Sequence, residues 1–176
     1  MSVPKEAERV KLICSIFSSR GEVLDMAIGR MEDMFGPLDW KSEGLFFDRT
    51  RYYENEMGWP LLRRFVTFRD LIDPEAIVEV KLRTNELEKV LSGAGRRSAN
   101  IDPGYLCMER LVLVTGKNYS HRIYLSKGIY ADLTLVFRKG CFRALPWTYR
   151  DYSDEHIIAQ FDEIRGKYKA QLRGKG

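Results

Sequence analysis

The residue best suited to acid–base chemistry is His121, which lies in the basic segment 117–122. A histidine titrates near neutral pH, so it can act as a general acid or base when a carboxylate lies beside it. We expect the carboxylate of Glu56 or Asp102 to approach His121 in the folded chain. The sequence therefore predicts a catalytic group of His121, Glu56 and Asp102. A second interpretation is that His121 only forms a hydrogen bond with segment 100–106 and stabilises a turn.

Metal chemistry is a weaker candidate, because the ligands that zinc prefers are scarce. The chain has two histidines and three widely spaced cysteines, with no CxxC pair, which is too few for a zinc cage. His156 falls in the first turn of the last predicted helix, where a capping or surface role is the simpler interpretation. A metal could be held only by oxygen ligands, namely Asp48, Glu54, Glu56 and Asp102. We expect no metal site, and the residues indicate no particular cofactor.

Polar and aromatic residues that could hold an anionic ligand recur in four separated segments. These segments are 48–58, 81–86, 100–106 and 117–122. If they meet at one end of a sheet, Lys81, Lys117 and Arg122 would suit a ligand that carries phosphate. A small, phosphate-bearing or nucleotide-like ligand is therefore our first functional hypothesis. The predicted ligand contacts are Arg51, Tyr53, Lys81, Asn85, Tyr105, Lys117, Arg122 and Tyr124.

The stretch from 100 to 149 is expected to form one antiparallel sheet segment, because apolar and polar residues alternate along residues 129–137,. A loop over 126–128 should join that strand to 121–125, with Leu125 opposite Ile129,. This register predicts that Ile123 faces Ala131 over the core. It also places Tyr124 opposite Tyr130 and Arg122 opposite Asp132.

Asp102, Pro103 and Gly104 are typical of a turn, because the aspartate can close it, the proline presets a dihedral angle and the glycine supplies the reversal,. The apolar run 111–114 indicates a central strand that is buried on both faces. A turn at Lys139 and Gly140 should lead to a further strand over 141–145.

The remaining elements are read from hydrophobic periodicity and from start and stop signals. Strands are expected over 10–17, 44–47 and 62–68, and helices over 22–35, from 73 to about 92 and from 153 onward. We predict an α+β fold with a mixed, mainly antiparallel sheet and three helices. Its first six elements could form a ferredoxin-like βαββαβ unit, with a β-meander after it.

Composition indicates one globular domain over 1–176, with flexible ends at 1–9 and 173–176,. The 176 residues have 44% hydrophobic content, enough for a single core. Three cysteines in no framework favour a reducing compartment, and no apolar stretch approaches the roughly 20 residues of a membrane span. We therefore expect a cytoplasmic protein that does not enter a membrane. The sequence does not determine the oligomeric state.

Two other functions stay open. The net charge of +4 is mild, but exposed Tyr124 and Tyr130 on the sheet, together with the basic tail 165–175, could bind RNA as a ribonucleoprotein accessory module. The simpler interpretation of the tail is that its cations complement the dipole of the last helix. A scaffold or homodimer that uses an open sheet edge is the remaining alternative.

Several strings recur in the order and at the separations known from one protein family. They are DRTRYYENEMG, KLRTNELE, NIDPGYL, HRIYL, GIYADLTL, RKG and PWTYRDY, between residues 48 and 152. In these strings the chain resembles a bacterial family catalogued as domain of unknown function 4416, and the likeness extends from Lys11 to about Leu172. The resemblance implies membership of a family and no mechanism. The phosphate-loop pattern GxxxxGK[ST] is absent from the sequence,.

Overall fold

The computed structural model describes residues 1–47, 51, 53–93 and 96–174. Within these ranges the chain forms one open antiparallel sheet of nine strands and four helices, of which α2 is a single turn. The elements are β1 (Val10–Ser18), α1 (Gly21–Phe35), β2 (Leu38–Lys41), β3 (Leu45–Phe47), α2 (Glu54–Met57), β4 (Leu61–Ile72), η1 (Pro74–Ala76), α3 (Ile77–Leu91), β5 (Asn100–Leu106), β6 (Arg110–Thr115), β7 (Arg122–Ser126), β8 (Ile129–Arg138), β9 (Cys141–Ala144), η2 (Arg150–Tyr152) and α4 (Glu155–Arg173). The predicted α+β class is confirmed.

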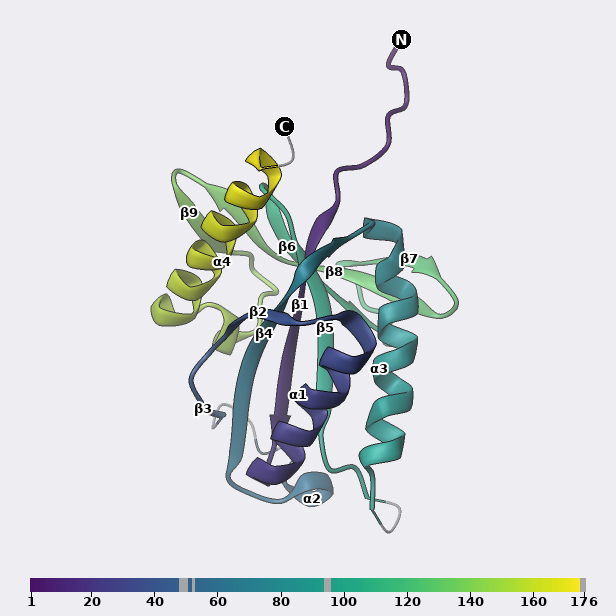
Figure 1. The fold of residues 1–176 in the computed structure, drawn as a ribbon, viewed down its shortest axis with the longest axis vertical. Helices are drawn as coiled ribbons and strands as arrows, with labels where there is room; N and C mark the ends of the chain where they lie inside the picture. Colours follow the sequence, from purple (N-terminus) through teal and green to yellow (C-terminus); the bar gives the residue numbers. More distant parts are fainter. Residues whose placement is uncertain (48–50, 52, 94–95, 175–176) are drawn as a thin grey trace.

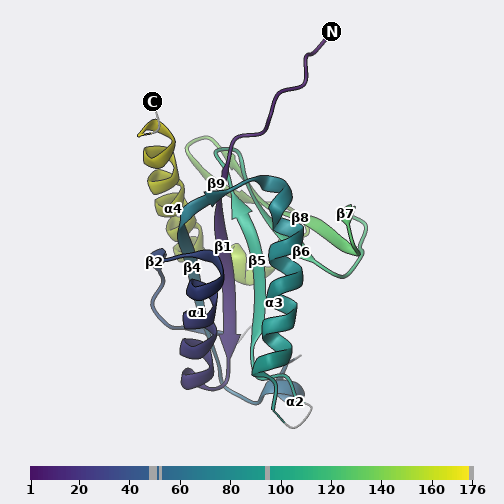
Figure 2. The same ribbon diagram turned by 45° about the vertical axis from the view of Figure 1, so that its right-hand side comes forward.

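The sheet is covered on both faces. Helices α1 and α3 pack on one face, and α4 packs on the other (Figures 1 and 2). The central strand β1 shows why the chain folds this way, because all of its residues are buried. Its alternating side chains Leu12, Cys14 and Ile16 join the core under α1 and α3, whereas Ile13 joins the core under α4. A strand buried on both faces is mostly apolar, as the sequence of β1 is apart from Lys11, Ser15 and Ser18,.

The strand order is β2-β4-β1-β5-β6-β8-β7, with β3 paired to β4 and β9 paired to β8. The chain starts with β1 and α1, continues with β2, β3, the one-turn helix α2 and β4, and then has α3 and β5. A βαββαβ unit has two strands between its helices, whereas three strands lie between α1 and α3, so the ferredoxin-like start stays a prediction. Strand β2 was not predicted, since Leu38–Lys41 is short and only partly buried. Residues 1–9 have no regular secondary structure and extend away from the sheet (Figure 1). Of the predicted flexible ends, residues 175–176 lie outside the described part of the chain.

The turn predicted at Asp102–Gly104 is wrong, because these residues lie inside β5. Strand β5 pairs with β1 from Asn100 to Leu106, and both Pro103 and Gly104 are buried. The local turn preference of Asp-Pro-Gly is overridden by pairing and burial along a central strand. Glycine has a separate role here, because a Cβ on residue 104 would collide with the backbone of β6.

The hairpin of β7 and β8 has most of the predicted register. Arg122 pairs with Asp132, Ile123 with Ala131 and Tyr124 with Tyr130, as expected. Ser126 pairs with Ile129, so the predicted pairing of Leu125 with Ile129 is wrong. The turn is shorter than expected and consists of Lys127 and Gly128, both with positive φ.

The predicted burial of Ile123 is also wrong, because its side chain is 69% exposed. Strand β7 lies at the edge of the sheet, where β8 is its one partner among the described strands. None of the helices described in the structure covers this part of the hairpin, which extends from the body (Figure 2). An alternating pattern identifies two faces of a strand, but it does not show that another layer covers one of them.

Candidate functional site

A cleft opens where β5 and β6 separate. Strand β5 pairs with β1 along its whole length, but it pairs with β6 only from Gly104 to Leu106. Beyond this point the residues before Gly104 and those after Leu113 diverge, and a cleft of about 560 Å³ lies between them and α3. Its polar lining residues are Tyr53, Arg63, Lys81, Asn85, Glu88, Arg97, Asn100, Asp102, Thr115, Lys117, Arg122, Asp132, Tyr149, Asp151 and Tyr152.

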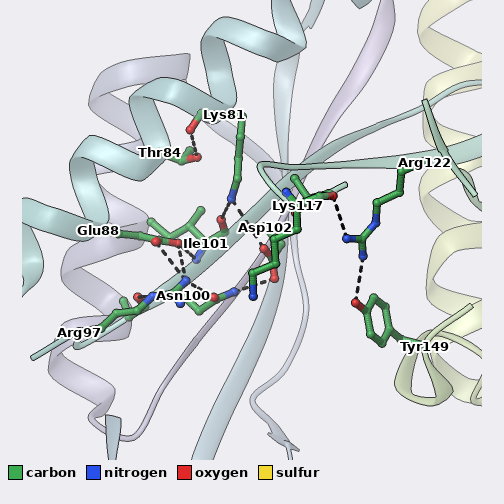
Figure 3. Close-up of polar contacts among 12 residues, drawn as sticks. Lys81, Thr84, Glu88, Arg97, Asn100, Ile101, Asp102, Lys117, Arg122 and Tyr149 are labelled. Carbon is green, nitrogen blue, oxygen red and sulfur yellow. Dashed lines mark hydrogen bonds and ion pairs between the residues drawn. The ribbon is translucent and has the colours of Figure 1, made fainter. Parts of the chain in front are cut away.

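Asp102 lies at the centre of a polar network that links β5 to α3 (Figure 3). Its Oδ2 accepts a hydrogen bond from Nδ2 of Asn100 at 2.6 Å. Its Oδ1 lies 3.7 Å from Nζ of Lys81, which donates a hydrogen bond of 2.9 Å to the carbonyl oxygen of Ile101. The buried ammonium of Lys81 is therefore held by one backbone carbonyl and one carboxylate, as a buried cation requires.

Glu88 of α3 also lines the cleft and binds strand β5. Its Oε1 accepts a hydrogen bond from the backbone N–H of Ile101 at 2.6 Å, and Oε2 lies 3.0 Å from the guanidinium of Arg97. Arg97 also donates to the side-chain oxygen of Asn100. Burial raises the pKa of Glu88, while the cations of Lys81 and Arg97 and the bond from Ile101 oppose that rise,. Glu88 and Arg97 together therefore hold Asn100 and Ile101, the two residues before Asp102, in place.

Arg122 organises the opposite side of the cleft. Its Nε donates to Asp132 at 2.8 Å, and the two side chains are only 10% and 9% exposed. One terminal nitrogen donates to the carbonyl oxygen of Lys117 at 3.0 Å, and the other donates to the hydroxyl of Tyr149 at 3.1 Å (Figure 3). Arg122 therefore fixes the loop that carries Lys117 as well as lining the cleft.

The segment that carries Tyr149 is attached to β8 between β7 and β9. Strand β7 pairs with β8 as far as Asp132, and β9 pairs with β8 from Leu135 onward. Residues 133 and 134 of β8 lie between these two paired stretches. Nε1 of Trp147 donates to the carbonyl oxygen of Leu133 at 2.8 Å, and Oγ1 of Thr148 donates to the carbonyl oxygen of Thr134 at 2.5 Å. These bonds satisfy two strand carbonyls and hold Tyr149 near Arg122.

The remaining cation of the lining, Arg63, is buried among aromatic rings. Its guanidinium forms an ion pair with Asp151, and the two side chains are 7% and 14% exposed. The guanidinium carbon lies 4.1 Å from the ring centre of Phe47 and 5.5 Å from that of Tyr152. Such a stack of a guanidinium on aromatic rings is favourable when both are removed from water.

The three residues predicted to be catalytic have different partners. Nε2 of His121 lies 3.3 Å from Asp132, and its ring stacks on Trp147. Glu56 lies 3.9 Å from Arg97 and is half exposed. Asp102, the only one of the three that lines the cleft, contacts Lys81 and Asn100 instead. The structure therefore does not bring His121, Glu56 and Asp102 together.

The predicted ligand contacts divide into two sets. Tyr53, Lys81, Asn85, Lys117 and Arg122 line the cleft. Three others lie elsewhere: Arg51 pairs with Glu54 on the surface, Tyr105 lines a separate hollow beside Arg110, and Tyr124 is exposed on β7.

The sequence prediction missed Arg63, Arg97 and Asp151 as lining residues. The sequence did contain a signal for Arg63, because residues two positions apart on a strand share a face. Arg63 lies between Leu61 and Phe65 on the buried face of β4. Arg97 lies outside regular secondary structure, and Asp151 lies in the three-residue 3-10 helix η2. Neither segment is long enough for a periodic pattern that would indicate the direction of a side chain.

The chemistry of the lining is charged and oxygen-rich. Four cations each pair with a carboxylate, in the pairs Lys81–Asp102, Arg97–Glu88, Arg122–Asp132 and Arg63–Asp151. Lys117 adds a further positive charge. Among the described residues there is no group of three His, Cys, Asp or Glu side chains that could hold a metal ion, and Asp48 lies outside those residues.

Fold and site together define an α+β protein with a charged cleft at a splayed antiparallel sheet. Residues 8–168 match the family model described as Domain of unknown function (DUF4416), and the chain belongs to this family. No curated protein and no solved structure matches the chain. None of the helices in the described ranges is long and apolar enough to cross a membrane.

Proposed function

We propose that the protein binds a small, phosphate-bearing ligand in the cleft between β5 and β6. The observation that carries the proposal is the convergence of Lys81 on α3, Lys117 after β6 and Arg122 on β7 in one lining. Lys81 comes from α3, whereas Lys117 and Arg122 come from the segment 117–122, so only the fold brings these two segments together. Lysine and arginine side chains form strong, charge-assisted hydrogen bonds to phosphate oxygens.

The size of the cleft supports a small molecule as the ligand. A volume of about 560 Å³ lies within the range of roughly 300–1,000 Å³ that is usual for small-molecule sites. The rings of Phe17, Tyr53 and Tyr152 add apolar surface to the charged groups. Polar groups that are fixed in place beside apolar surface can set the orientation of a ligand. A nucleotide-like ligand falls within this class.

The proposal is tested by thermal-shift and calorimetric titration with inorganic phosphate and pyrophosphate. We expect Lys117→Gln to weaken binding at least about tenfold, since one charge-assisted hydrogen bond is worth roughly 1.5–3 kcal/mol. Lys169→Gln is the matched control, because Lys169 is an exposed lysine of α4 outside the lining. Equal binding by the two variants would contradict the proposal.

RNA binding is a second candidate, supported by one observation. Tyr124 is 58% exposed on the edge strand β7, with the ring of Tyr130 at 5.2 Å from its own. Exposed aromatic rings on a sheet can stack on unpaired bases. Affinity for single-stranded RNA that falls with salt and with Tyr124→Ala would favour this function, and no detectable affinity at low salt would remove it.

The proposal includes a cytoplasmic location. Cys14, Cys107 and Cys141 are all free thiols, which agrees with a reducing compartment. Fractionation of cells with an antibody against the protein tests this part directly.

A further inference from the structure

One carboxylate of the cleft differs from the others in its exposure. The side chains of Asp132, Glu88 and Asp151 are 9%, 13% and 14% exposed, whereas that of Asp102 is 37% exposed. The first three are largely enclosed with the arginines that they neutralise. Asp102 is therefore the carboxylate of the lining that a ligand can reach most easily.

The oxygen atoms of Asp102 also have room for another donor. Oδ2 accepts one bond from Asn100, but Oδ1 is 3.7 Å from Nζ of Lys81, beyond hydrogen-bond distance. Lys81 instead donates a hydrogen bond to the carbonyl oxygen of Ile101. An ionised carboxylate only accepts hydrogen bonds. The partner of Asp102 in a ligand must therefore be a donor, such as a hydroxyl group.

The cleft thus offers a ligand two kinds of polar group, a hydrogen-bond acceptor and a set of cations. Asp102 on β5 supplies acceptor oxygens, whereas Lys117 and Arg122 supply positive charge, and all three residues line the same cavity. Figure 3 shows the bond between Arg122 and the backbone of Lys117. A phosphate ion alone is small for a cavity of about 560 Å³,. The rings of Phe17, Tyr53 and Tyr152 give an apolar surface for the rest of the ligand.

We propose that the ligand is a phosphorylated sugar or polyol, whose hydroxyl groups donate to Asp102 and whose phosphate lies toward Lys117 and Arg122. This inference rests on the function proposed above, and it adds the class of molecule that carries the phosphate. A carboxylate commonly accepts hydrogen bonds from sugar hydroxyls, as an acidic residue does from a ribose in dinucleotide-binding folds.

The test is calorimetric titration with ribose 5-phosphate, inorganic phosphate, ribose and phosphoethanolamine at constant ionic strength. We expect the wild type to bind ribose 5-phosphate at least about tenfold more tightly than inorganic phosphate, a difference of about 1.4 kcal/mol. In Asp102→Asn this ratio should fall below about threefold, because the strong charged acceptor is lost. Asp25→Asn, an exposed position of α1, should keep the full ratio.

The ratio compares two ligands on one protein, so a change in the folded fraction of a variant does not alter it. Equal affinities of the wild type for ribose 5-phosphate and phosphate would overturn the inference and leave phosphate binding intact. A preference for phosphoethanolamine would also overturn it, because Asp102 would then bind an ammonium group. Failure of all phosphate-bearing probes to bind would contradict the proposed function itself.

Discussion

Gly104 lies against Val112 so closely that a Cβ at position 104 would collide with the carbonyl oxygen of Val112. The same Cβ would lie 2.9 Å from a methyl carbon of Leu113. This contact belongs to the last paired position before β5 and β6 separate. The close approach of β5 and β6 at Gly104 therefore depends on the absence of a side chain at this residue.

We predict that Gly104→Ala destabilises the protein by about 2–4 kcal/mol, since a methyl group forced against backbone atoms displaces a strand. Urea unfolding followed by circular dichroism measures the change. Gly166→Ala is the control, because Gly166 lies in α4 with nothing within 4 Å of an added Cβ. It should instead stabilise the protein, by up to about 1 kcal/mol. A neutral Gly104→Ala would show that β5 and β6 do not meet as described.

Asp151→Ala should cost about 3–5 kcal/mol, because it leaves the guanidinium of Arg63 buried without its partner,. Chemical denaturation of the single variant is the first measurement. The double variant Arg63→Met with Asp151→Ala should recover part of the loss, since no unpaired charge remains. Glu86→Ala, which breaks an exposed pair with Lys89, should cost less than about 0.5 kcal/mol.

The stability of the protein should fall in alkali partly because of Tyr168. Burial raises the pKa of this hydroxyl to about 12, compared with about 10 in an unfolded chain. The native state therefore holds the proton more tightly, and its stability contribution is intact below about pH 10 and declines between about pH 10 and 12.

Unfolding free energies measured from pH 8 to 11 test this dependence. Tyr168→Phe should give a flatter profile, together with a loss of about 1 kcal/mol at pH 8 for the hydrogen bond to the carbonyl of Arg9,. Tyr119→Phe, at an exposed ring, should keep the wild-type profile. An unchanged slope in Tyr168→Phe would exclude Tyr168 as a source of the decline.

Lys139→Asn should stabilise the hairpin of β8 and β9 by about 0.5–1 kcal/mol. Lys139 has a φ of 51° and is followed by Gly140 with a φ of 86°, the pattern of a turn that favours Asn-Gly. Thermal unfolding measures the gain, and Lys139→Val should lower stability because a β-branched residue resists positive φ. A loss of stability in Lys139→Asn would contradict the turn geometry.

Much of the fold could be predicted from periodicity. The pairing of Arg122 with Asp132 followed from alternation and a glycine turn, and it holds. The error at Asp102–Gly104 has a physical reason, because turn preference is local and the pairing of β5 with β1 joins residues about 90 positions apart,. Burial of Ile123 was wrong for a related reason, since the sequence does not show that β7 is an edge strand.

The site could be predicted only in part. The convergence of segments 81–86 and 117–122 was inferred from residue type, and Lys81, Asn85, Lys117 and Arg122 do line one cleft. The register of the hairpin placed Asp132 opposite Arg122, but the acidic partners of the other cations were not assigned. His121 was expected beside Glu56 or Asp102, whereas Asp132 lies beside it. Which carboxylate meets which cation depends on strand order, and strand order is not encoded in any short stretch of residues.

The most direct test of ligand binding in the cleft is a crystal structure of the protein grown with ribose 5-phosphate. We predict electron density for the phosphate beside Lys117 and for the sugar hydroxyls beside Asp102, in the cavity between β5 and β6. A cleft that holds no ligand at saturating concentration, with density only at surface lysines elsewhere, would contradict the central claim.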